Sequence, residues 1–175
     1  MNNTIRTVAL VGMLAAASAC TPFATYPPAD NKAINPQAAV NDPIPALMVG
    51  SIEYSQTIYA TSGDPAINLP AGSSRNLYKR VIHRLGTGHP MTDPKELAYQ
   101  ITQVRARGTK AQVDIFVPRA DGTYGFATLY FGHTLKGYRV EHIRWWETGD
   151  QPPGIDTGTP AQQPPAAAQP VLAHQ

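Results

Sequence analysis

The segment Ala111-Gln-Val-Asp-Ile-Phe-Val117 decides the fold class, because apolar and polar residues alternate along it. A period of two places its three β-branched apolar residues, Val113, Ile115 and Val117, on one face of a β-strand. The pairs Gly108-Thr109 and Asp121-Gly122 on either side are turn signals. The segment therefore predicts a strand with an antiparallel neighbour on each side.

The segments around these turns extend the pattern into a four-stranded meander. Residues 99–107 and 124–131 are strand-like and enclose residues 111–117. Lys136-Gly137 forms the next turn, and residues 138–147 form the last strand. Such a sheet has one apolar face that another element must cover.

One amphipathic helix is predicted before the meander. Ser73 or Ser74 can cap its N-terminus, and Gly86 can end it after residue 85. Its apolar residues form a single stripe at helical spacing, namely Leu77, Val81, Ile82 and Leu85. We therefore expect an α+β fold, with one amphipathic helix packed on a four- to five-stranded antiparallel meander sheet and Pro-rich disordered tails on both sides.

Two further segments have local signals. Residues 51–59 alternate Ile52, Tyr54 and Ile58 with polar residues, which favours a strand, with a helix as the alternative. Residues 92–96 have Pro94 at the position of a helix start, which predicts one short helical turn. Together these signals predict a small domain over residues 49–148.

The N-terminal residues 1–19 have the three zones of an export signal. A polar start with Arg6 precedes a short apolar core, and Ala17-Ser18-Ala19 supplies the small residues of a cleavage site. The core is too short for a bilayer-spanning helix, which needs about 20 apolar residues. Residues 1–19 are therefore predicted to be a cleaved signal peptide.

The sequence Ala17-Ser18-Ala19-Cys20 resembles the lipobox of bacterial lipoproteins. The resemblance implies cleavage between Ala19 and Cys20 by the lipoprotein signal peptidase, and acylation of Cys20, which is the only cysteine of the chain. Thr21, rather than Asp, follows the cysteine and implies an outer-membrane location facing the periplasm. The alternative is cleavage by the ordinary signal peptidase after an A-x-A site, which releases a soluble exported protein.

The two ends of the mature chain are rich in proline. Residues 20–48 are predicted to form an extended, lipidated tether, and residues 149–175 a disordered Pro/Ala/Gln-rich tail. The helix and meander between them resemble the cone-shaped sheets of nuclear-transport-factor-like and cystatin-like domains. Those folds host enzymes and non-catalytic binding modules alike, so the resemblance leaves the function open.

The charged residues suggest one candidate surface. The chain has 14 basic residues, and Arg6 is removed with the signal peptide. The remaining 13 basic and 12 acidic residues give a net charge of +1, which argues against nucleic acid as a partner. A cluster that binds an anionic lipid, lipopolysaccharide or acidic protein is predicted if the helix and the first hairpin adjoin. Its members are Arg75, Lys79, Arg80, Arg84, Arg105, Arg107 and Lys110. The alternative is a solvated helix face.

No catalytic motif, metal-ligand spacing or cofactor-binding loop is recognised, so we expect no catalytic residues, no metal and no cofactor. The prediction is a lipid-anchored envelope protein whose non-catalytic domain binds another envelope component or serves structurally. One alternative is a small pocket enzyme that uses His142 with Asp114 or Glu141. That alternative requires the side chains to converge in one cavity.

Overall fold

The computed structural model describes residues 24–28, 39–59 and 63–147 of the chain. The predicted signal peptide, Cys20 and the C-terminal tail lie outside these residues. The described part contains two helices and seven strands. In chain order they are β1 (Ala24–Tyr26), α3 (Ile44–Tyr59), β2 (Ala66–Asn68), α4 (Arg75–Leu85), β3 (His89–Pro90), β4 (Ala98–Arg107), β5 (Lys110–Pro118), β6 (Tyr124–Thr134) and β7 (Gly137–Trp146).

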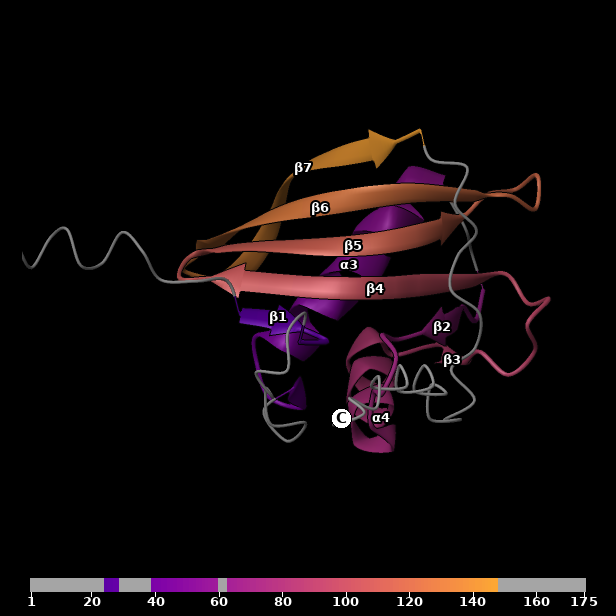
Figure 1. Ribbon diagram of the computed structural model, residues 1–175, viewed down its shortest axis with the longest axis horizontal. Coiled ribbons are helices and arrows are strands. Elements are labelled where there is room, and N and C mark those ends of the chain that lie inside the picture. Colours follow the sequence, from indigo (N-terminus) through magenta and orange to yellow (C-terminus); the bar gives the residue numbers. More distant parts are fainter. Residues whose placement is uncertain (1–23, 29–38, 60–62, 148–175) are drawn as a thin grey trace, which may run out of the picture.

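The predicted meander is confirmed. Strands β4 to β7 are consecutive and antiparallel, and tight turns join them (Figure 1). Val113 pairs with Leu129, and Leu129 pairs with Ile143, so the branched residues of neighbouring strands form one continuous apolar face. The alternation in residues 111–117 thus set the register, as expected from a period of two.

The sheet is larger than predicted and is not entirely antiparallel. Its order is β3-β2-β4-β5-β6-β7, and β1 also pairs with β4. Strand β4 is ten residues long, and two short strands share its outer edge. β2 pairs in parallel with its first part, and β1 pairs antiparallel with its last part. Both are three residues long, too short for an alternating pattern to identify them from the sequence.

Residues 51–59 belong to a helix, so the predicted strand is wrong. Helix α3 begins at Ile44, and its buried residues recur at helical spacing as Ile44, Leu47, Met48, Ser51, Ile52 and Ser55. Half of this stripe lies before residue 51, in the part predicted to be a tether. Residues 51–59 were therefore interpreted without residues 44–48, whose apolar side chains establish the helical spacing.

Two serines allow α3 to pack closely on the sheet. The hydroxyl groups of Ser51 and Ser55 are buried and donate hydrogen bonds to the carbonyl oxygens of Leu47 and Ser51, each at 2.7 Å. Because each hydroxyl is bonded within the helix, its burial leaves no unsatisfied donor. The small side chains let the helix approach β4 and β5, and Gly50 lies against the Phe131 ring.

Helix α4 has the predicted ends. Ser74 caps its N-terminus by accepting a hydrogen bond from the Leu77 amide at 3.2 Å, and Gly86 ends it with φ of 76°. Leu77 and Val81 of the predicted stripe are buried, and Ile82 and Leu85 pack at the margin of the core. Residues 92–96 form a turn rather than a helical turn, closed by the Glu96 amide and the Asp93 carbonyl at 3.0 Å.

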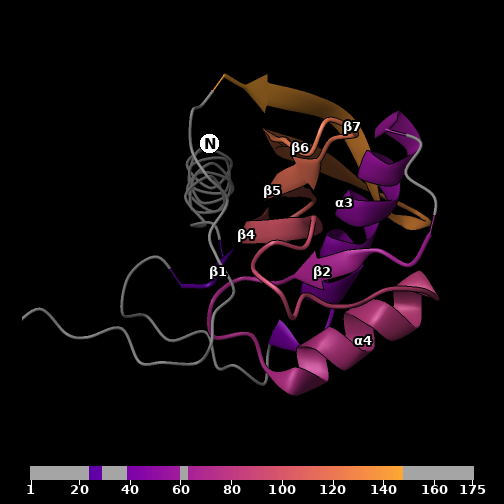
Figure 2. The same ribbon diagram turned by 90° about the vertical axis from the view of Figure 1, so that its right-hand side faces the viewer.

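The core lies between α3 and one face of the meander. α3 packs against β4, β5 and β7, and α4 packs against α3 (Figure 2). Neither described helix lies on the opposite face of the sheet, which we call the open face. The folded chain begins earlier than the predicted domain start at residue 49, because β1 and the first turn of α3 both precede it.

The assignment of α3 as a helix can be tested with two isoleucines. In a strand, Ile52 and Ile58 would share a face, whereas in α3 Ile52 is fully buried and Ile58 is 42% exposed. We expect Ile52→Ala to lower the free energy of unfolding by about 2–5 kcal/mol. Ile58→Ala should change it by no more than about 0.5 kcal/mol. Chemical denaturation measures both, and equal losses would contradict the helix.

Candidate functional site

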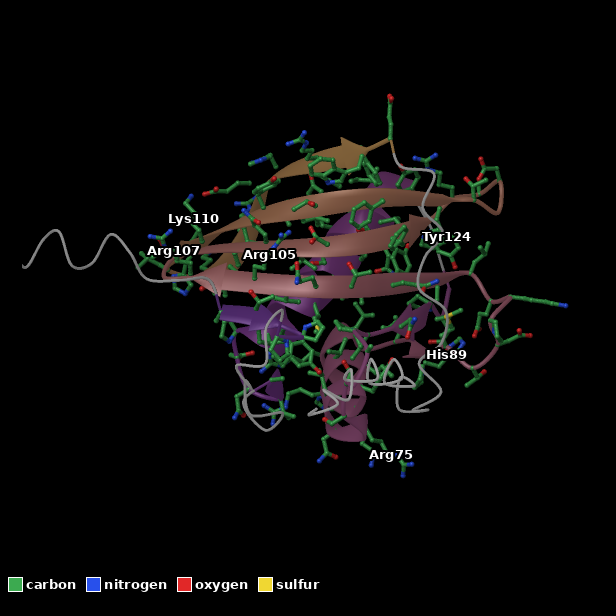
Figure 3. All side chains as sticks on the ribbon, viewed as in Figure 1. Arg75, His89, Arg105, Arg107, Lys110 and Tyr124 are labelled. Atoms are coloured by element: carbon green, nitrogen blue, oxygen red, sulfur yellow. The ribbon has the colours of Figure 1, made fainter. Side chains whose placement is uncertain are left out.

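The structure separates the seven predicted basic residues into two groups. Arg75, Lys79, Arg80 and Arg84 lie on α4, whereas Arg105, Arg107 and Lys110 lie at the hairpin of β4 and β5. In Figure 3 Arg75 is at the foot of α4, and Arg107 and Lys110 are at the far end of the sheet. The two groups therefore do not form one continuous patch.

At least three of these seven residues are paired with carboxylates. Arg84 binds Asp42 through Nη1 and Nη2, and the contact from Nη2 to Oδ2 is 3.0 Å. This hydrogen bond lowers the pKa of Asp42 and raises that of Arg84. Lys110 Nζ lies 2.8 Å from Glu141 Oε1. The third pair, Arg105 with Asp114, belongs to the open face of the sheet.

The turns of β4–β5 and β6–β7 lie side by side and form what we call the hairpin end of the sheet, residues 107–110 and 134–139 (Figure 1). The His133 amide donates to the Thr109 carbonyl at 2.8 Å, and the Tyr138 hydroxyl donates to the Gly108 carbonyl at 2.9 Å. The Lys110–Glu141 pair adds a further link between β5 and β7. These contacts hold the two turns in one fixed arrangement.

The hairpin end contains functional candidates that the sequence analysis missed. Leu135 is fully exposed at the tip of the β6–β7 turn, and Lys136 and Arg139 beside it are also exposed. With Arg107 and Lys110 they place four basic residues at this end of the sheet near one exposed leucine, and Glu141 is paired with one of them, Lys110. An apolar residue followed by lysine within a turn was the available signal, but the segment was read only as a turn.

His142, Asp114 and Glu141 do not converge. The His142 ring stacks on Tyr130, with ring centroids 4.1 Å apart. Glu141 extends over Gly132 to Lys110, and the Asp114 carboxylate bonds to Arg105 and Thr128. Each of the three side chains therefore has separate partners, and the arrangement lacks the shared acid–base contact that the enzyme alternative requires.

A polar ladder crosses four strands on the open face. Arg105 Nη2 lies 2.7 and 2.6 Å from the two oxygens of Asp114, and the Thr128 hydroxyl donates to Asp114 at 2.6 Å. Thr128 in turn accepts a hydrogen bond from Trp146 Nε1 at 3.0 Å, and Arg144 lies 3.8 Å above the Trp146 ring. These contacts join the four strands and engage the Asp114 carboxylate from both sides. The buried Nε of Arg105 has no hydrogen-bond partner among the described residues.

His89 lies at the opposite end of the sheet (Figure 3), and its ring bridges two carboxylates. Its Nδ1 lies 3.0 Å from Asp64 Oδ2, and its Nε2 lies 2.7 Å from Glu96 Oε1. Hydrogen bonds to Glu96 and Asp64 raise the pKa of His89 above 6.5, and the bond to His89 lowers the pKa of Glu96. Two carboxylate partners suit the doubly protonated ring, in which each nitrogen can donate to one of them, and the bridge joins two loops.

A cavity of about 320 Å³ lies next to this bridge. Its lining is largely apolar, with Pro65, Leu97 and Tyr99 among the residues, and it includes Arg119 and Glu96. The Glu96 carboxylate is already held by His89. The cavity is therefore a space for an apolar group rather than an assembled catalytic site.

Among the described residues, no group of three His, Cys, Asp or Glu side chains is arranged to hold a metal ion. No helix within the described ranges is long and apolar enough to span a bilayer. Comparisons with protein-family models, curated proteins and solved structures found no match for this chain.

The His89 bridge predicts a defined dependence of stability on pH. The raised pKa of His89 means that its contribution is complete below about pH 6.5 and is lost as the pH rises through the folded-state pKa. The lowered pKa values of Asp64 and Glu96 mean that their contribution is lost as the pH falls below their ordinary values of 3.8 and 4.5. The bridge should therefore stabilise most between these limits.

The measurement compares urea midpoints of the parent and His89→Gln across this pH range. The difference in midpoint should be largest near pH 5.5 and should shrink as the pH rises from 6 to 9. His83→Gln, on the exposed side of α4, is the matched control for removal of a histidine, and the trend for His89→Gln is measured relative to it. A difference that is constant over the whole range would contradict the charged bridge.

Proposed function

We propose that this chain is a lipid-anchored envelope protein, held in a membrane by acyl chains on Cys20, whose small α+β domain is non-catalytic. The observation that carries the proposal is the sequence itself, in which an apolar export signal ends at Ala17-Ser18-Ala19-Cys20. Two or more acyl chains bind a bilayer firmly, because each buried CH₂ contributes about 0.8 kcal/mol. We place the protein in the outer membrane, facing the periplasm, because Thr21 follows the cysteine.

The non-catalytic role is supported by how the titratable groups are engaged. Asp114, Glu141 and His89 all have ionic or hydrogen-bonded partners within the domain. His142 stacks on an aromatic ring. A group that must exchange a proton with a substrate needs an accessible and correctly directed atom, which these arrangements do not provide. Binding of another envelope component, or a structural role, then accounts best for the domain.

The proposal is tested by the covalent state of Cys20. Protein extracted from membranes should begin at Cys20 and have the added mass of acyl chains, and Cys20→Ser should remove that mass and move the protein to the soluble fraction. Ser18→Ala, which keeps the thiol, is the matched control and should remain membrane-bound. Recovery of an unmodified N-terminus at Cys20, or full sedimentation of Cys20→Ser with membranes, would defeat the proposal.

A further inference from the structure

We propose that the hairpin end of the sheet, centred on Leu135, is the surface that rests on an anionic lipid bilayer, so that the domain lies against the membrane with its opposite end facing away. This inference deepens the proposed function and rests on it for the anchor at Cys20. Three independent features of the described residues support it: the position of β1, the charge of the hairpin end and the exposure of Leu135.

The position of β1 sets how far the domain can lie from the anchor. Ala24 pairs with Ala106 and Tyr26 pairs with Val104, so β1 runs antiparallel to β4. The chain therefore enters β1 from the end of the sheet at which β4 stops, which is the hairpin end (Figure 1). Cys20 precedes Ala24 by four residues, and four residues span at most about 14 Å. An acylated Cys20 must hold this end of the sheet near the bilayer.

The charge of the hairpin end suits an anionic surface. It contains Arg107, Lys110, Lys136 and Arg139; of the two carboxylates on the hairpin strands, Glu141 pairs with Lys110 and Asp114 pairs with Arg105. The other end of the sheet, near His89 and Tyr124 in Figure 3, has the opposite character. Its loops contain Asp64, Asp93, Glu96 and Asp121 against Lys95, Arg119 and the His89 that bridges two of these carboxylates. Attraction to anionic headgroups therefore favours one orientation of the sheet.

Leu135 supplies the apolar contact. It is the most exposed large apolar residue of the described chain and lies at the outermost turn of β6–β7. An exposed leucine with a lysine beside it can enter the headgroup region while the lysine amine stays with the phosphates. The contacts that join the two turns keep Leu135 and the basic residues on the same side.

The test uses the mature chain with Cys20→Ser, because an unacylated protein reports the affinity of the surface alone. Flotation with vesicles of 30% phosphatidylglycerol in phosphatidylcholine, at low ionic strength, should show binding that pure phosphatidylcholine vesicles lack. Lys136→Gln with Arg139→Gln should lower the partition coefficient about 25-fold, at about fivefold for each basic residue. Leu135→Ser should lower it about tenfold.

Matched controls separate this surface from the rest of the domain. Lys79→Gln with Arg80→Gln removes two exposed basic residues of α4, and Ile58→Ser removes an exposed apolar residue of α3. Both should leave the partition coefficient within about twofold of the parent. Equal losses in the two basic pairs, a larger loss from the α4 pair, or no preference for the anionic vesicles would overturn the inference.

The outcome is distinguishable from that for the anchor. If mass measurement finds no acyl chains on Cys20 but the vesicle binding follows the hairpin variants, the proposed anchor fails and the lipid-facing surface stands. If Cys20 is acylated and the hairpin variants have no effect, the anchor stands and the inferred surface is wrong.

Discussion

The pairing of β1 with β4 is the constraint on which this account of the protein depends. The three residues of β1, Ala24–Tyr26, pair with residues 104–106 at the end of β4, and Tyr26 is buried there. Backbone hydrogen bonds to an edge strand fix both direction and register, which side-chain contacts alone would not do. A segment that composition alone describes as a spacer thus begins a folded domain four residues after Cys20. Under the proposed acylation of Cys20, the anchor and the hairpin end then have to be close together.

The two faces of the sheet are stabilised by different contacts. The core lies between one face and α3, where Leu129 of the sheet packs with Leu47 and Ile52 of the helix, and its burial provides most of the stability of the domain. The opposite face is held together by the polar ladder from Arg105 to Arg144 and by aromatic contacts such as that of Phe116 with Phe126. These contacts engage the Asp114 carboxylate and the Thr128 hydroxyl, whereas the buried Nε of Arg105 has no hydrogen-bond partner among the described residues.

The sequence predicted the parts of the fold that have strong local signals. Alternation in residues 111–117, the turn at Asp121-Gly122 and the Ser74 and Gly86 ends of α4 gave the meander and one helix. The prediction for α3 was wrong because the domain boundary placed at residue 49 divided the apolar stripe of this helix. Strands β1 to β3 were not predicted because two or three residues are too few to show an alternating pattern. The basic residues of α4 and the first hairpin were recognised by charge, but their separation depends on the packing of α4 beneath β2. Leu135 and Arg139 could not be assigned to one surface with Arg107 until the register of β4 to β7 was known.

The most direct measurement of the central claim is the depth of single sites in the acylated protein on a bilayer. Cys20 is the only cysteine of the chain and is consumed by acylation under the proposed function, so one introduced thiol can be labelled with a polarity-sensitive fluorophore. We predict that a label at Leu135→Cys is quenched by doxyl lipids, whereas labels at Ala120→Cys in the β5–β6 turn and Asn76→Cys on α4 are not. Stronger quenching at residue 120 or 76 than at residue 135, or no quenching at any of them, would contradict the account.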